Sequence, residues 1–203
     1  MAVMDGLSAR DAKRLQTRER LMGAAIAEFK RSGMAQADVS AIVAAAGVAH
    51  GTFFFHFPTK EHVLFELERR EEERMAKQLS QFLKSRRELS AVLNEAVGLV
   101  MGLERRLGDS LFKDFLALHF SQTRPPVEDG YGHPVIVLVA EQIEGARGRG
   151  DTDPTVNPTN SAVFFLLGLY ALLIVTHEWE TRRALVEDYL ARTLRSIQSP
   201  ASR

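Results

Sequence analysis

Apolar residues recur along this chain at intervals of three and four positions, and nowhere in strict alternation. Such spacing predicts helices with one buried face and argues against strands. Proline and glycine are sparse and fall between the apolar stretches, where they mark helix ends. The sequence therefore predicts an all-α fold of about nine helices, at about residues 13–32, 38–46, 50–57, 59–85, 87–107, 110–120, 134–145, 158–180 and 182–198.

Helix-end residues divide the first sixty positions into three helices. Asp38 is a good N-cap for the second helix, because its carboxylate can accept from a free backbone N–H. Gly47 stands where the end of that helix favours a left-handed residue, and Pro58 stops the third helix. Two short helices joined by a tight glycine turn form a helix-turn-helix, whose second helix can enter the DNA major groove. Helical hairpins are common, so spacing alone leaves this assignment open.

The residues of the turn and third helix favour a helix-turn-helix over an ordinary helical hairpin. Residues 46–61 read A-G-V-A-H-G-T-F-F-F-H-F-P-T-K-E. They resemble the signature of the tetracycline-repressor (TetR) family, whose usual form is A-G-V-S-x-G-T-[L/F]-Y-x-H/Y-F-x-[S/T]-K-E. Further matches in the first two helices are Arg18, Leu21, Ala24, Ala25, Phe29, Gly33, Val39 and Ile42.

The resemblance covers about residues 15–75 and implies a DNA-binding domain there, with the helix-turn-helix at about 38–57. Over the rest of the chain it rests on helix count and order, and implies an effector-binding and dimerisation domain at 86–198. It places the DNA-facing positions at Asp38, Ala49, His50, Gly51, Thr52, Phe54, His56 and Lys60.

Each of these positions has an expected role. His50 stands at the variable position that points into the groove, where an imidazole can donate to or accept from a base edge. Thr52 can reach a phosphate or a base, and Gly51 permits close approach to DNA. His56 and Lys60 are expected to hold phosphates, with Lys60 at a helix N-terminus where backbone amides add to the attraction. The remaining aromatic residues of the stretch are expected in the core: Phe53, Phe55 and Phe57.

Four departures from the family pattern predict weaker backbone anchoring rather than a different function. Ala49 replaces a serine that would cap the third helix and contact a phosphate. Phe54 replaces a tyrosine, which removes a hydroxyl. Asp38 replaces a threonine and would repel a nearby phosphate, and Glu28 stands where leucine is frequent in the first helix.

Charge alone would not suggest a nucleic-acid partner, because the chain carries 26 basic and 26 acidic residues. Residues 1–62 hold eight Lys/Arg against six Asp/Glu. Their net charge is therefore positive, as a DNA-binding segment requires, although it is small. The absence of cysteine excludes disulfides and thiolate metal sites. The first thirteen residues lack the apolar core of a signal peptide, and the apolar run 162–175 is shorter than a bilayer span. We therefore expect a cytoplasmic protein without membrane contact.

The second domain is expected to hold a small effector and to form a homodimer. Apolar and aromatic side chains at helical spacing are candidates for the pocket, although such stripes are usually core. Few of these candidates are charged, so they favour an apolar or aromatic effector. The candidate residues are Val97, Met101, Phe112, Phe115, Leu116, His119, Phe120, Phe165, Leu169 and Tyr170. His119 is expected as a core histidine or polar anchor, because no second ligand stands at metal spacing; we expect no metal or cofactor.

Residues 158–198 are the expected dimer interface. The helix at 158–180 is apolar nearly all round and the last helix has a wide apolar stripe, which one small domain cannot bury completely. In the TetR family these two helices pair with their copies, and such an isologous interface fits a two-fold symmetric operator of double-stranded DNA.

Three alternatives remain beside a DNA-binding repressor. An enzyme is disfavoured, because the chain contains no G-x-S-x-G, H-E-x-x-H or P-loop motif, and no dinucleotide fingerprint after a strand. An all-helical interaction or ligand-binding module without a DNA role is the second alternative. The third is an activator, since the sign of regulation depends on operator position.

Overall fold

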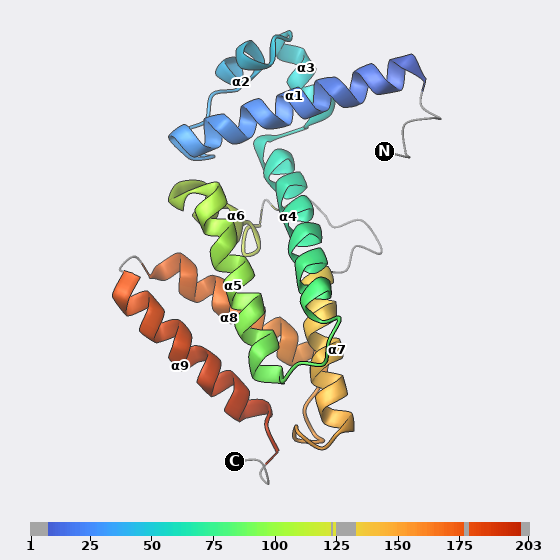
Figure 1. Ribbon diagram of the computed structural model, residues 1–203. Coiled ribbons are helices and arrows are strands. Elements are labelled where there is room, and N and C mark those ends of the chain that lie inside the picture. The colour runs from blue at the N-terminus through green and yellow to red at the C-terminus, as the bar shows by residue number, and fades with distance from the viewer. Residues whose placement is uncertain (1–7, 123, 125–132, 177–178, 200–203) are drawn as a thin grey trace. The chain divides into compact units, whose positions relative to one another are not determined.

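A computed structural model describes residues 8–122, 124, 133–176 and 179–199. Within these residues it contains nine α-helices and no strand, which confirms the expected all-α fold (Figure 1). The helices are α1 (Ala9–Ser32), α2 (Val39–Ala46), α3 (His50–His56), α4 (Lys60–Phe82), α5 (Leu89–Leu107), α6 (Asp109–Leu118), α7 (Pro134–Gly148), α8 (Pro158–Val175) and α9 (Trp179–Ile197). The expected ends at 85 and 180 were too late, since α4 ends at Phe82 and α8 at Val175.

The chain divides into two compact units. The first consists of Met1–Leu67 with Leu107–Pro125, and the second of Glu68–Arg106 with Pro126–Arg203. The expected domains at 15–75 and 86–198 stay a prediction; in this division α6 belongs to the first unit, where it packs against α1. The backbone N–H of Met34, just after α1, donates to Asp114 of α6 at 2.7 Å.

An aromatic and aliphatic core holds the first unit together. Phe29 from α1, Ile42 from α2, and Phe53 from α3 are fully buried. Gly47 links α2 to α3 in the left-handed conformation, with φ 63° and ψ 44°, as expected for a helix-ending glycine. Figure 1 shows α2 lying against α1.

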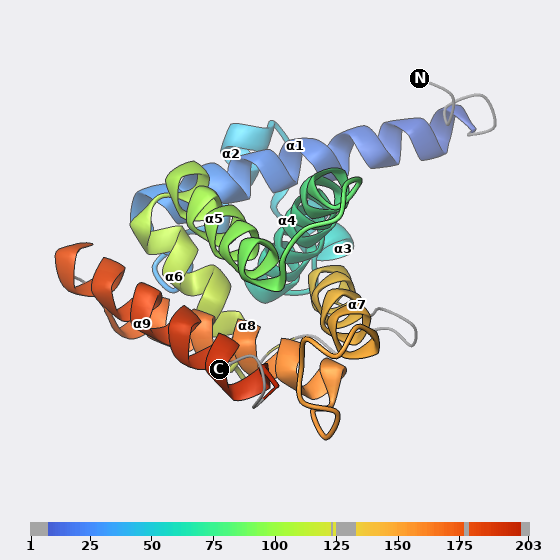
Figure 2. The same ribbon diagram turned by 60° about the horizontal axis from the view of Figure 1, so that its bottom comes forward.

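In the second unit α8 packs against α7 and α9 (Figure 2). The Tyr189 hydroxyl of α9 donates to the Phe165 carbonyl of α8 at 2.7 Å, and the two rings stack with centroids 6.1 Å apart. Gly168 allows this approach, because a Cβ there would overlap the Tyr189 ring and hydroxyl. Burial of the ring raises the pKa of Tyr189, so its hydroxyl remains a donor at neutral pH.

Two further contacts close the α8–α9 hairpin. The Arg182 guanidinium of α9 is buried, donates to Glu104 at 2.7 Å and reaches the Leu173 carbonyl at 3.2 Å. At the far end, Thr152 before α8 pairs with Gln198 after α9 in an isolated antiparallel bridge. The entry and exit of the hairpin are therefore joined by backbone hydrogen bonds.

By length and composition α8 is apolar enough to cross a membrane, with a mean hydropathy of 1.8 over 18 residues. The expectation that this segment is too short was wrong, because the helix begins four residues before the run 162–175. Asn157 caps it and Pro158 occupies its first turn, as expected. A third of α8 is buried within the chain.

We expect Gly168→Ala to lower the free energy of unfolding by ~1–3 kcal/mol, because the added methyl group overpacks the contact with Tyr189. Gly98→Ala in α5 is the matched control, since a Cβ there would meet no described atom within 4 Å. Helix propensity alone predicts that Gly98→Ala raises the free energy of unfolding by ~0.5–1 kcal/mol. Urea denaturation of both variants tests this, and equal effects would contradict the close approach of α8 and α9.

Candidate nucleic-acid interface

Helix α3 has one buried face and one exposed face. Phe53 and Phe57, four residues apart, are both fully buried. Phe54 is 48% exposed and Phe55 is 72% exposed. The expectation that Phe55 belongs to the core was wrong, because two residues along a helix turn the chain by about 200° and carry Phe55 away from Phe53.

The exposed side of α3 consists of His50, Gly51, Phe54 and Phe55, which we call the outer face. Thr52 is half-buried beside it, and the imidazole of His50 lies 5.5 Å from the Phe54 ring, centroid to centroid. A Cβ on Gly51 would meet no described atom within 4 Å, so packing inside the chain does not require glycine there. The outer face can therefore present an imidazole, a bare backbone and two aromatic rings to a partner.

Capping of α2 and α3 follows the sequence expectations. The Asp38 carboxylate accepts from the Ser40 N–H at 2.8 Å and so caps α2. Ala49 occupies the N-cap of α3 and, as an alanine, offers no capping side chain. The first turn of α3 thus retains backbone N–H groups that can bind a phosphate oxygen.

Glu28, which stands in α1 where leucine is frequent, is buried and hydrogen-bonded. Its carboxylate accepts from two nitrogens of Arg31, at 2.6 and 3.0 Å, and from the Asp38 N–H at 3.4 Å. The hydrogen bonds from Arg31 are the main reason why the pKa of Glu28 is lowered. This side chain stabilises the start of α2 in place of the usual leucine packing.

Arg18 of α1 fixes the C-terminal end of α3. Its guanidinium donates to the His56 carbonyl and lies over the Phe57 ring, 4.1 Å from the centroid. A second nitrogen of the same group is 3.4 Å from a Glu66 oxygen in α4. One side chain therefore connects α1, the end of α3 and the beginning of α4.

His56 lies half-buried next to these cations. Its pKa is lowered from the ordinary value of 6.5, first by burial and then by the charges of Arg18 and Arg14. The imidazole is consequently uncharged at neutral pH in the free protein. It can still donate one hydrogen bond to a phosphate, and protonation would add a charge beside DNA.

Lys60 is engaged inside the chain. Its ammonium donates to the carbonyls of Ala35 and Ala37, at 3.0 and 3.1 Å, and so holds the segment between α1 and α2. An ammonium has three N–H donors, of which these bonds use two. The phosphate contact expected for Lys60 stays a prediction that the third donor could fulfil.

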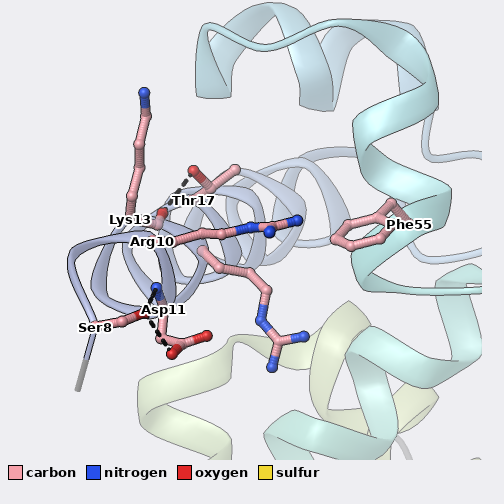
Figure 3. Close-up of a pocket in the computed structure, with 7 residues that line it drawn as sticks. Ser8, Arg10, Asp11, Lys13, Thr17 and Phe55 are labelled. Carbon is pink, nitrogen blue, oxygen red and sulfur yellow. Dashed lines mark hydrogen bonds between the residues drawn. The ribbon is translucent and has the colours of Figure 1, made fainter. Parts of the chain in front are cut away.

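The beginning of α1 carries residues that the sequence analysis did not select. Arg10, Lys13 and Arg14 are exposed and line a hollow of about 610 Å³ on whose far side Phe55 lies. Figure 3 shows the Arg10 side chain extended toward the Phe55 ring. Exposed cations close together can hold phosphate oxygens, although Asp11 in the first turn of α1 offsets part of their charge. The cluster of basic residues at 10–14 is visible in the sequence and could have identified these positions.

The candidate effector residues are distributed over both units. Buried Phe112, Phe115 and Leu116 lie in the first unit, where the His119 ring is 6.1 Å from that of Phe115, and Phe120 is 52% exposed. The second unit contains the others, buried except for half-buried Met101: Val97, Met101, Phe165, Leu169 and Tyr170. Their role in effector binding stays a prediction.

Comparisons with known proteins agree with this interface. Residues 21–67 match the family model for bacterial regulatory proteins of the tetR family, and this segment contains α2, α3 and most of α1's buried face. No curated protein sequence matches the chain.

Solved structures resemble the whole chain at low sequence identity. A TetR-family transcriptional repressor from Thermus thermophilus, FadR in complex with lauroyl-CoA, is 23% identical, covers 88% of this chain and 91% of its own, and has a TM-score of 0.68. FadR from Bacillus subtilis in complex with stearoyl-CoA is 14% identical, with coverage of 87% and 97% and a TM-score of 0.62. SmeT, the repressor of a Stenotrophomonas maltophilia multidrug efflux pump, is 19% identical, with coverage of 93% and 95% and a TM-score of 0.62.

We expect Lys13→Gln to weaken binding to operator and random DNA alike, because the exposed ammonium neutralises a phosphate. The slope of log affinity against log salt should fall in magnitude by about 0.9 for each subunit bound. Lys60→Ala should flatten the slope similarly and also lower the melting temperature, since two carbonyls lose their donor. Arg195→Gln in α9 is the control, and a slope unchanged by Lys13→Gln would remove α1 from the interface.

We expect the DNA affinity of the wild type to rise more steeply than that of His56→Gln as pH falls below neutrality. Protonation of His56 adds positive charge at the interface. Because the pKa of His56 is lowered, we expect this increase in DNA affinity at a lower pH than for an ordinary imidazole. Stability changes in the opposite direction. The unfolded chain binds this proton at a higher pH than the folded chain does, so the free energy of unfolding falls as pH falls through the ordinary imidazole range. Parallel affinity and melting curves for both proteins over this range would contradict a role for His56.

Proposed function

We propose that this chain, whose residues 21–67 match the model for the tetR family, is a DNA-binding transcriptional regulator that acts as a homodimeric repressor. The dimer binds a palindromic operator in double-stranded DNA, and a small apolar or aromatic effector releases it. The outer face of α3 carries the DNA part of this proposal, since it presents base-reading and backbone-approaching groups on one side of a short helix.

An exposed apolar stripe on α8 carries the dimer part of the proposal. Phe164 and Val175 are each 71% exposed, and Leu167 and Ala171 lie between them on the same side of the helix. On α9, Leu185 is also exposed. Apolar surface of this extent marks an interaction site, and a second copy can cover it through an isologous interface.

A two-fold dimer determines what operator the protein reads. Each copy contributes one α3, so the two half-sites are inverted repeats about one helical turn, or a multiple of it, apart. His50 reads a base in each half-site, while the basic beginning of α1 and the first turn of α3 hold phosphates. A regulator of chromosomal DNA acts in the cytoplasm, and the covered α8 stripe needs no membrane.

The effector is expected to be apolar because the candidate residues of the second unit offer few charges. Two of the similar repressor structures contain lauroyl-CoA and stearoyl-CoA, whose acyl chains are apolar. Long-chain acyl-CoA molecules are therefore the first probes, with free fatty acids and aromatic compounds next. Within the second unit the proposed contacts are Val97, Met101, Phe165, Leu169 and Tyr170.

One experiment tests the whole proposal. The purified protein should retard a fragment of the intergenic region upstream of its own gene, and footprinting should show an inverted repeat. Addition of an effector should release that fragment, while a random fragment should bind weakly throughout. A protein that retards neither fragment is an interaction module, and one that increases transcription from the bound promoter is an activator.

We expect two matched substitutions to separate dimerisation from DNA binding. Phe164→Glu should give a monomer in sedimentation and lose operator affinity, because a charge enters the covered stripe. Phe55 is exposed to nearly the same extent, at 72%, but lies on the outer face of α3. Phe55→Glu should leave the dimer intact and weaken DNA binding by repulsion from phosphates. A dimeric Phe164→Glu variant would place the interface elsewhere.

A further inference from the structure

Two carboxylates are buried side by side in the second unit. Glu68 and Glu72 of α4 are 0% and 2% exposed, and their spacing of four residues places them on one face of the helix. An ionised carboxylate in a protein interior is unfavourable unless it is paired or coordinates a metal ion. Two of them in one place need positive charge close to both.

A histidine from a distant part of the chain meets this pair. The Nδ1 atom of His133 lies 2.8 and 3.0 Å from the two oxygens of Glu72. His133 caps α7 and precedes Pro134, which restricts its backbone to the extended conformation observed, with φ −68° and ψ 103°. The imidazole is therefore held against α4 from a second element, and its partial exposure leaves an approach from solvent.

The distances within this group suit a single ion. The ligand atoms of Glu68, Glu72 and His133 lie within 4.8 Å of one another. Nitrogen and oxygen ligands bound to one zinc ion at about 2.0–2.2 Å are about 3–4 Å apart, so small side-chain rotations bring all three into range.

We propose that Glu68, Glu72 and His133 bind a divalent first-row transition metal ion through two carboxylate oxygens and one imidazole nitrogen. Mixed nitrogen and oxygen donors favour zinc, cobalt, nickel or manganese, whereas magnesium and calcium prefer oxygen ligands alone. The ion joins the middle of α4 to the start of α7 and thereby stabilises the second unit. The proposal is independent of the proposed function, because neither DNA nor effector takes part.

The site was not visible from the sequence. Glu68 and Glu72 belong to the charged run 66–74, and a run of this composition is ordinary for a solvated helix face. His133 stands 61 residues beyond Glu72, so no metal-ligand spacing links them. The expectation that the chain holds no metal therefore rested on local spacing, which this group does not use.

Metal titration of the full-length protein, first stripped with a chelator, tests the proposal. We expect calorimetry with Zn²⁺ to show one ion per chain, and Co²⁺ to give a visible absorption band that Zn²⁺ abolishes. Mg²⁺ at the same concentration should not bind. The melting temperature should rise on addition of Zn²⁺, since the ion binds the folded state.

Matched variants on the same helix distinguish this site from adventitious binding. Glu68→Gln and His133→Ala should each weaken Zn²⁺ binding by about 100-fold or more, because even outer partners of metal ligands contribute 10–100-fold. Glu73→Gln, an exposed neighbour on α4, should bind as the wild type does. In metal-free protein the circular dichroism spectra of Glu68→Gln and of the wild type should agree, which shows that the variant folds.

Two results would overturn the proposal. One is a wild-type chain that binds neither Zn²⁺ nor Co²⁺ at micromolar concentration. The other is equal Zn²⁺ affinity in Glu68→Gln and Glu73→Gln. Either result leaves the retardation of operator DNA unaffected and so distinguishes failure of the metal site from failure of the proposed function.

Discussion

A seven-residue helix is not stable by itself, and the candidate DNA-reading surface depends on how α3 is held. Two anchors hold it. Phe53 and Phe57 bury one side completely, and Arg18 donates to the carbonyl at the end of the helix while lying over the Phe57 ring. Every group on the outer face owes its position to these contacts, because the first turn of α3 has no capping side chain.

Polar contacts also hold the segment that precedes α2. Lys60 holds the segment before α2 through two carbonyls, and the buried carboxylate of Glu28 accepts from the N–H of Asp38, the N-cap residue of α2. Neither contact follows from an apolar core, yet both hold the segment that leads from α1 into α2. The exposed cations at the beginning of α1 are available to an approaching anion.

Local signals in the sequence were sufficient for the helices and their caps. Asp38, Gly47 and the Asn157–Pro158 pair act in the structure as their residue types predict. Phe55 was misplaced because the three phenylalanines were treated as one group, although helical periodicity separates it from the other two. Contacts between distant segments could not be predicted from the sequence. The hydrogen bond from Met34 to Asp114 joins residues 80 positions apart, and the contact of His133 with Glu72 joins residues 61 positions apart. Such pairings depend on the tertiary fold, and no local pattern encodes them.

The bridge between Thr152 and Gln198 ties the entry of the α8–α9 hairpin to its exit. Together with the buried Arg182 and the Tyr189 hydrogen bond, it connects the two helices at three places. We expect a hairpin connected in this way to open as one cooperative unit, as foldons do, rather than turn by turn. A subunit interface built on these helices would be lost in a single step, so partially detached dimers would be scarce, and a cell would contain the regulator in two states with little between them.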